Sequence, residues 1–301
     1  MASGSAHAAH RRLLPWLVLL LSAVTASCAD GNGKLGASMS ARWRNMLDGV
    51  AKQGGMYDAE RAKAASLMKK RTLAACEDAV ALLEQCLARS PEEPDPALCL
   101  EAAQARNAVM RIRTHSNTLH ITRMLDTKAS KKVWSEHGPR AVELATRAKQ
   151  ALPRDPEALV AYADAYFFAN SVKGVLAAAT TGSGLKFKGN SKELISKCPT
   201  AEGGIGHAYL GAFFLMAPWP LANAKKAEEH LGAAYKIAKC RRNCYYLGVM
   251  HYRLGRPAKA AHFFREAIKA KPLTPAEGDF TEWVLTEAKS ALKVAEAECV
   301  A

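Results

Sequence analysis

The sequence is poor in aromatic residues, which make up 7% of its 301 positions, and no segment alternates apolar and polar residues with a period of two. Without such alternation, a half-buried β-strand would have no apolar face to turn toward a core. Hydrophobic residues nevertheless make up 49% of the chain, with alanine and leucine prominent among them. These residues favour helices, so we predict an all-α protein with a sizeable core.

The sequence also lacks any residue constellation typical of catalysis, cofactor binding or metal binding. His115 and His120 have no nucleophile or acid beside them, and Cys240 and Cys244 have no second ligand pair at zinc-site spacing. The glycine-rich stretch at 182–189 lacks the final Gly-Lys-Ser/Thr of a phosphate loop. We therefore predict a protein that is not an enzyme and needs no cofactor. The alternative is an enzyme whose site is not recognisable from sequence.

The net charge of +14 is spread along the chain, with lysine and arginine recurring every three to five residues. Basic residues without interleaved aromatics do not resemble a nucleic-acid module, so we predict no nucleic-acid partner. Two basic stretches, with a tryptophan between two prolines, indicate a surface for an acidic protein or peptide segment or a headgroup. The alternative is an ordinary solvated surface. The candidate partner surface consists of Lys128, Lys131, Lys132, Lys186, Lys188 and Trp219.

The N-terminal 29 residues have the pattern of a secretory signal peptide. Arg11 and Arg12 precede an apolar core from Leu13 to Val24, and Ser27 and Ala29 are small residues placed for cleavage. The apolar core would span about 18 Å as a helix, whereas a bilayer core is about 30 Å thick. We therefore predict an extracytoplasmic location: the secretory pathway, the periplasm or an organelle lumen. Cleavage removes two arginines and no acidic residue, which leaves a charge of +12.

Three alternatives for the same N-terminus stay open. Ala26-Ser27-Cys28 resembles a bacterial lipobox, in which Cys28 would be lipidated. The segment could instead be the first part of a bipartite leader to a plastid, or an uncleaved anchor. Contact with a membrane is predicted only if Cys28 is lipidated or the signal is retained.

The segment from Arg241 to Thr274 has the pattern of a helix hairpin. Gly255-Arg256-Pro257 separates two apolar-periodic halves, and small or apolar residues in the second half let the helices approach closely. This segment closely resembles a tetratricopeptide repeat (TPR). The residues that carry the resemblance are Leu247, Gly248, Tyr252, Ala260, Phe264, Ala267 and Pro272.

The small-residue spacing of this segment recurs at 79–91, 141–153 and 227–240. We therefore predict a right-handed solenoid of helical hairpins, with roughly four degenerate TPR-like repeats over residues 58–301 and a capping helix that begins at Thr274. Its first helix is expected from about Asp58 to Arg89. Residues 30–57 are expected to form a linker and a short helix, and residues 170–204 an irregular insertion.

A narrower resemblance lies mainly in residues 203–267. Gly203-Gly204 before a helix, and Trp219-Pro220 before KKAEEHLGAAYKIA, resemble the TPR lipoprotein family associated with TRAP transporters. The C-terminal half also resembles the regulator of microtubule dynamics proteins. The TPR resemblance implies a non-enzymatic protein-binding or scaffold protein. The transporter resemblance implies, as an alternative, an accessory ligand-binding component with an internal cavity, which Tyr162, Tyr166 and Phe213 would line.

The eight cysteines allow disulfides in an oxidising compartment. Cys86 and Cys99 flank the first interhelix turn and could pair with each other. The alternative is that several cysteines are buried small hydrophobes. The disulfide candidates are Cys86, Cys99, Cys198, Cys240, Cys244 and Cys299.

Overall fold

The computed structural model describes residues 57–89, 94–122, 126–174, 177–178 and 181–300. The chain divides into two units, residues 1–59 and residues 60–301, and nearly all the described residues belong to the second unit. The predicted signal peptide, the lipidation candidate Cys28 and almost all of the predicted linker lie outside the described residues, so these stay predictions.

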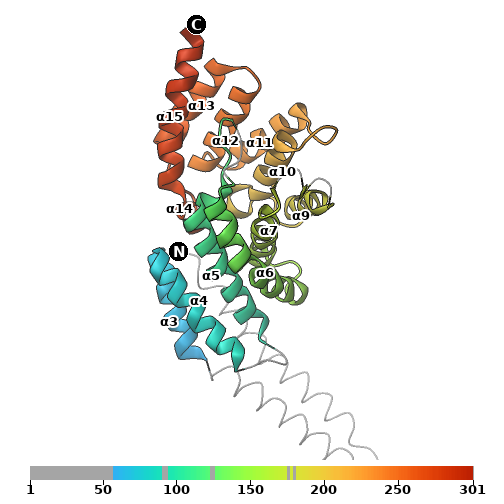
Figure 1. The fold of residues 1–301 in the computed structure, drawn as a ribbon, viewed down its shortest axis with the longest axis vertical. Coiled ribbons are helices and arrows are strands. Elements are labelled where there is room, and N and C mark those ends of the chain that lie inside the picture. Colours follow the sequence, from blue (N-terminus) through green and yellow to red (C-terminus); the bar gives the residue numbers. More distant parts are fainter. Residues whose placement is uncertain (1–56, 90–93, 123–125, 175–176, 179–180, 301) are drawn as a thin grey trace, which may run out of the picture. The chain divides into compact units, whose positions relative to one another are not determined.

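The described residues form helices and no β-strand (Figure 1). No helix among them is both long enough and apolar enough to cross a membrane. The helices are α3 (Asp58–Lys70), α4 (Leu73–Ala88), α5 (Pro96–Thr114), α6 (Lys128–Ala151), α7 (Pro156–Ser171), α9 (Ser183–Lys197), α10 (Ile205–Met216), α11 (Ala224–Ile237), α12 (Arg241–Arg253), α13 (Pro257–Lys269), α14 (Pro275–Gly278) and α15 (Thr281–Val300), with short 3-10 turns at His115–Asn117 and Ala201–Gly203.

Helices that follow one another in the sequence pack against one another. The run α4, α5, α6 and α7 does so, and so does the run α9, α10, α11, α12 and α13, after which α15 packs on α13. Alternate helices also touch, since α5 contacts α7, and α12 contacts α15. This arrangement confirms the prediction of an all-α solenoid of helical hairpins that ends in a capping helix.

The predicted small-residue spacing lies on the buried faces of the second helices. All twelve residues of the pattern are at most 1% exposed: Ala79, Leu83, Cys86, Ala141, Ala145, Ala148, Ala227, Leu231, Ala234, Ala260, Phe264 and Ala267. In the α12–α13 hairpin, a Cβ atom added to Gly248 would lie 2.5 Å from ring atoms of Phe264. Glycine is therefore required there for the two helices to approach.

Two parts of the chain differ from the expected elements. The prediction of a single helix from Asp58 to Arg89 is wrong, because the segment forms two helices, α3 and α4. Arg71 takes a left-handed conformation (φ 52°) between them, and the hydroxyl of Thr72 caps α4. The segment 170–204, expected to be irregular, contains the fifteen-residue helix α9, which packs on α7 and α10.

The expected helix start at Thr274 is present, but only one turn follows it. The hydroxyl of Thr274 accepts a hydrogen bond from the backbone N–H of Glu277, as an N-cap does. The Glu277 carboxylate does not bond back to the N–H of Thr274. It accepts hydrogen bonds from the backbone N–H groups of Arg242 and Leu273, both at 2.8 Å. After the turn at Asp279 a second helix, α15, begins, and α15 is the helix that caps the solenoid.

Candidate functional site

A cavity of about 580 Å³ lies between α7, α9 and α10, beside the connection that follows α5. Its volume falls in the range of about 300–1,000 Å³ that is usual for small-molecule pockets. Most of its surface is apolar, and its aromatic lining residues are Tyr166, Phe167, Phe187, Tyr209, Phe213 and Tyr246.

Rings from three helices form the walls. The Phe187 ring of α9 lies 5.3 Å from that of Phe167 in α7 and 5.4 Å from that of Tyr209 in α10, measured between ring centroids. Rings at such distances hold one another by edge and offset contacts. Gly184 lines the cavity beside them and is closely packed on one side, because a Cβ atom there would lie 3.3 Å from the Ala178 carbonyl oxygen and 3.7 Å from the Phe213 ring.

A buried chain of polar groups begins at the cavity wall. The Tyr209 hydroxyl donates a hydrogen bond to the carboxylate of Asp164, and Arg111 donates to the same carboxylate at 2.6 Å. Burial raises the pKa of Tyr209 well above its ordinary value, and the neighbouring Asp164 raises it further. Tyr209 therefore remains a neutral phenol at physiological pH, with its ring in the cavity and its hydroxyl in the core.

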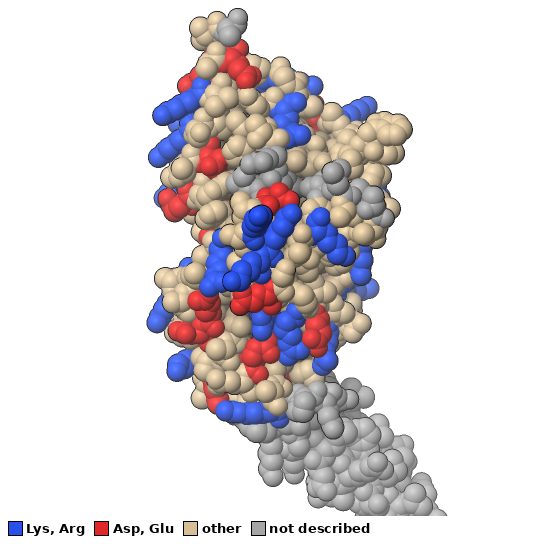
Figure 2. Space-filling view, viewed as in Figure 1, with Lys and Arg blue, Asp and Glu red and all other residues tan. Residues whose placement is uncertain are grey.

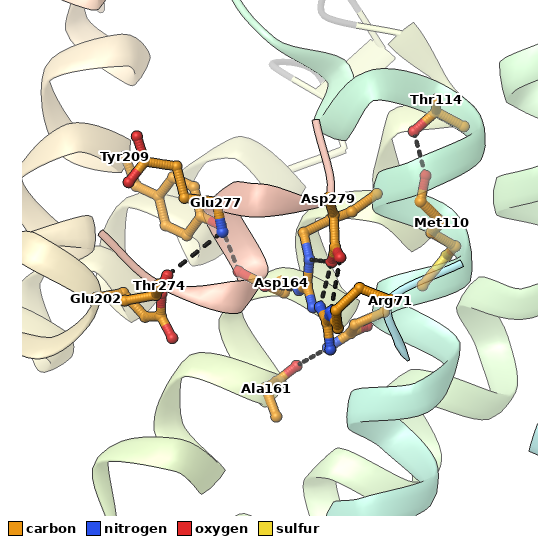
Figure 3. Close-up of polar contacts among 12 residues, drawn as sticks. Arg71, Met110, Thr114, Ala161, Asp164, Glu202, Tyr209, Thr274, Glu277 and Asp279 are labelled. Carbon is orange, nitrogen blue, oxygen red and sulfur yellow. Dashed lines mark hydrogen bonds and ion pairs between the residues drawn. The ribbon is translucent and has the colours of Figure 1, made fainter. Parts of the chain in front are cut away.

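The same chain ties the first hairpin to the last helices (Figure 3). Arg111 also donates to Asp279 at 2.8 Å, and Arg71 holds Asp279 with two hydrogen bonds across 208 positions of sequence. Burial opposes the charge of Arg111, but Asp279 and Asp164 outweigh it and raise the pKa of Arg111 above its usual value. A buried arginine between two carboxylates satisfies the requirement that buried charges be paired.

Lysines stand over the aromatic walls. Lys186 Nζ lies 5.1 Å from the centroid of Tyr166, and Lys188 Nζ lies 5.7 Å from that of Phe213. Such contacts are attractive because the face of an aromatic ring carries partial negative charge. At another part of the lining, Lys131 pairs with Asp126 at 3.5 Å, and Asp126 borders the cavity together with Lys173.

The structure thus brings Lys131, Lys186 and Lys188 of the candidate partner surface close to one cavity. Lys128 and Lys132 are on the first turns of α6, and Lys128 is exposed. Trp219 is 90% exposed and is joined to Pro220 by a cis peptide bond, while its neighbour Pro218 lines the cavity.

Net positive charge is not gathered into one patch on the face shown in Figure 2, where lysines and arginines lie among carboxylates. Several of the basic side chains are paired. Arg106 and Arg140, for example, both hold Glu84, at 2.9 Å and 3.0 Å. The lysines beside the cavity are therefore a more specific feature than the net charge of the chain.

The chain's own α5–α6 connection packs against α12 of the C-terminal hairpin. Leu119 of this connection is 1% exposed and belongs to the same core cluster as Tyr245 and Tyr246 of α12. Arg253 donates to the carbonyl oxygen of Thr122 at 2.9 Å, which fixes the connection along α12.

All seven described cysteines are free thiols, and the candidate pairs are not joined in this structure. Cys86 and Cys99 are fully buried, and burial raises the pKa of both thiols. Burial also raises the pKa of Cys244 to about 12. Within the described ranges, no group of three or more His, Cys, Asp or Glu side chains is placed to hold a metal ion.

Sequence reasoning named Tyr166 and Phe213 of the cavity but also named Tyr162, which is not among the lining residues. Instead, Tyr162 lies under Lys149, whose Nζ is 4.4 Å from its ring centroid. The reasoning missed Phe187, which stands between two lysines in a stretch without apolar periodicity. It also missed Asp164, for which a signal existed: an acid within the apolar run ALVAYADAYFFA.

Comparison with known proteins identifies the fold. No family model matches the chain, and no curated protein matches it. Seven chains among the solved structures match. One is TTC0263, described as a thermophilic TPR protein of Thermus thermophilus, with 16% identity and a TM-score of 0.53 over 77% of this chain and 98% of that one. Another is MamA, with 16% identity and a TM-score of 0.33 over 55% of this chain and 89% of that one. The fold is thus similar to that of a TPR protein.

Proposed function

We propose that this protein is a non-enzymatic binding protein and that the aromatic cavity is its binding site. The observation that carries the proposal is the cavity itself: about 580 Å³, walled by aromatic rings from α7, α9 and α10. A mostly apolar cavity with few polar groups is the usual form of a recognition site. Stacks of helical hairpins also commonly present binding surfaces to other proteins.

The partner that suits this site is a protein or peptide segment with an apolar side chain flanked by acidic residues. The apolar side chain would enter between Phe187 and Phe213, where it exchanges water for aromatic contacts. The acidic residues would meet Lys173 and Lys186 at the edge. Attraction between these opposite charges speeds association and weakens as salt rises.

We place this activity in an extracytoplasmic compartment. The support is the N-terminal sequence: a basic pair, a twelve-residue apolar core and small residues before Asp30. Determination of the mature N-terminus by mass spectrometry tests this part. A chain that begins at Asp30, or at a lipidated Cys28, supports it, and a chain that retains residues 1–29 and is recovered without membranes contradicts it.

The binding site is tested by selecting a displayed random peptide library on the purified protein. The selected peptides should combine an aromatic or aliphatic residue with neighbouring Asp or Glu. Their binding should be lost in Gly184→Trp, which fills the cavity, and retained in Gly189→Trp, because a Cβ atom at Gly189 meets nothing within 4 Å. Equal binding by both variants would show that the peptides bind elsewhere.

A second function, the capture of a small apolar ligand for a transporter, is favoured by the size of the cavity and by the presence of Tyr166 and Phe213 in its lining. Native mass spectrometry of the purified protein tests it. A small molecule that co-purifies with the wild-type protein and is absent from Gly184→Trp would support this function. A protein free of any such molecule, together with peptide selection at the cavity, would favour the peptide-binding function.

A further inference from the structure

Two large apolar side chains that project into water lie beside the cavity. Leu185 is 51% exposed and stands between Gly184, which lines the cavity, and Lys186, which covers Tyr166. Trp219 is 90% exposed and follows Pro218, another lining residue. In Figure 1, α9 and the α10–α11 connection lie on the same side of the unit, next to α10. Gly184 and Pro218 line the same cavity, so the residues that follow them, Leu185 and Trp219, lie at one edge of that cavity.

Nothing within the described chain covers Trp219, and prolines stand on both sides of it. Proline fixes its own φ and restricts the residue before it, so the indole is held outward by a stiff connection. Tryptophan combines a large apolar body with one N–H donor, and for this reason it is enriched at membrane–water interfaces.

The charges at this edge are mainly positive. Lys173 lines the cavity, and Lys186, Lys188 and Lys226 stand over the rings of α7 and α10. Asp126 is the one carboxylate among the lining residues, and Lys131 pairs with it. The ammonium groups of Lys186, Lys188 and Lys226 lie over ring faces, and Lys186 is an exposed residue, so an anionic surface can reach it. Such an edge is complementary to a surface whose outer layer is anionic and whose interior is apolar.

We propose that this edge, defined by Leu185, Trp219, Lys173, Lys186 and Lys188, docks on an anionic phospholipid bilayer. Trp219 and Leu185 enter the interfacial region, and the lysines contact the phosphate and carboxylate headgroups. The inference goes beyond the proposed binding function and is independent of lipidation at Cys28. It also places the cavity at the membrane–water interface.

Quenching of tryptophan fluorescence by brominated lipids tests the contact at the indole itself. The full chain is mixed with vesicles of phosphatidylcholine and phosphatidylserine (roughly 70:30, which gives the surface the negative potential of an anionic leaflet) whose acyl chains are brominated. The part of the quenching due to Trp219 is the difference between the wild-type protein and Trp219→Phe. This difference isolates the docking edge from the apolar N-terminus, which could itself bind vesicles. Trp283→Phe, which alters a tryptophan on α15, serves as the matched control.

The expected result is quenching that Trp219→Phe removes and Trp283→Phe preserves. Replacing Lys186 and Lys188 by Gln should weaken binding to these vesicles about 25-fold at low salt, because each lysine near an anionic surface contributes about a factor of five. The same change at Lys239 and Lys269 should have little effect. Equal quenching in wild type and Trp219→Phe would overturn the proposal. The proposal would also be overturned if an acidic peptide or a second copy of the chain shields the Trp219 indole from a water-soluble quencher while vesicles do not. The edge would then be a protein interface.

Discussion

The α12–α13 hairpin and the α7–α9–α10 region are built from the same kind of helix but are packed in opposite ways. In the hairpin, Gly248 lies so close to Phe264 that an added Cβ atom would come within 2.5 Å of the ring. In the other region, a cavity of about 580 Å³ stays open between the helices, and Gly184 is one of its lining residues. A small residue closes the helix pair at Gly248, whereas large aromatic side chains line the space that stays open at the cavity.

Aromatic residues explain much of the difference. The ring of Phe264 faces Gly248 and fills the gap between α12 and α13. In the cavity region, by contrast, rings from α7, α9 and α10 contact one another and line the cavity. The first region therefore contributes rigidity, and the second offers a surface to a ligand.

The largest effect is expected in the buried polar chain, which joins the first hairpin to the last helices. Asp279→Ala should lower the free energy of unfolding by about 3–5 kcal/mol, because Arg71 and Arg111 would lose the buried carboxylate they share. Urea unfolding followed by circular dichroism measures this. Asp126→Ala, which breaks the half-exposed pair with Lys131, should cost at most about 1 kcal/mol. Similar losses in both variants would mean that the buried pairs at Asp279 stabilise the protein no more than the half-exposed pair does.

The close packing of the hairpin is tested by Gly248→Ala. The added methyl group should destabilise the protein by about 1–3 kcal/mol, as overpacking of a filled site does. The same change at Gly189, where α9 has open space, should stabilise it by about 0.5–1 kcal/mol, because alanine favours a helix more than glycine does. Thermal unfolding shows whether each variant is less or more stable than the wild-type protein. If Gly248→Ala stabilised the protein, the hairpin would be loosely packed.

A smaller effect is expected from the histidine pair that joins α10 to α11. The Nδ1 atoms of His207 and His230 lie 3.1 Å apart, and burial lowers the pKa of both rings. The unfolded chain therefore takes up protons first, near the ordinary pKa of about 6.5. The stability contributed by the neutral pair is present above this pH and is lost as the pH falls through the lowered values.

Denaturant unfolding at a pH of about 7 and again at about 5, on either side of the ordinary histidine pKa, measures this loss. The decrease in stability should be smaller in the double variant His207→Gln, His230→Gln than in the wild-type protein. His262→Gln, at an exposed position of α13, is the control and should leave the decrease unchanged. An identical decrease in all three proteins would mean that the pair does not titrate on unfolding.

The smallest effect on stability is expected from the lysines over the cavity walls. Lys186→Glu with Lys188→Glu should cost about 1–2 kcal/mol at most, since a cation over an exposed ring contributes about 0.5–1 kcal/mol. The same double change should, however, strongly weaken the capture of acidic peptides selected on the wild-type protein. Fluorescence anisotropy of a labelled selected peptide measures the affinity, and an unchanged affinity at both low and high salt would contradict the proposed role of these lysines.

The repeat architecture could be predicted from sequence because its signal is local. Ala260, Phe264 and Ala267 mark one face of one helix, and each recurrence of the spacing indicates another hairpin. The break at Arg71 could not be predicted, because a left-handed arginine has no distinctive composition around it. Helix α9 was missed because its glycines and lysines resemble those of a loop.

The cavity could be predicted only in part. Tyr166 and Phe213 were named because they are large residues on repeat helices, but a cavity depends on what remains unfilled between elements far apart in sequence. Likewise, the contact of Arg71 with Asp279 joins positions separated by 208 residues and leaves no periodic trace. Long-range polar networks of this kind are visible only in three dimensions.

The most direct test of the central claim is a titration of the protein with 8-anilinonaphthalene-1-sulfonate, an apolar aromatic probe that carries one negative charge. We expect saturable binding at one site by the folded wild-type protein, with enhanced fluorescence. Binding should be lost in Gly184→Trp and kept in Gly189→Trp, with circular dichroism spectra unchanged in both variants. Saturable binding that persists in a folded Gly184→Trp protein, or no binding by the wild type, would contradict the claim that the aromatic cavity is the binding site.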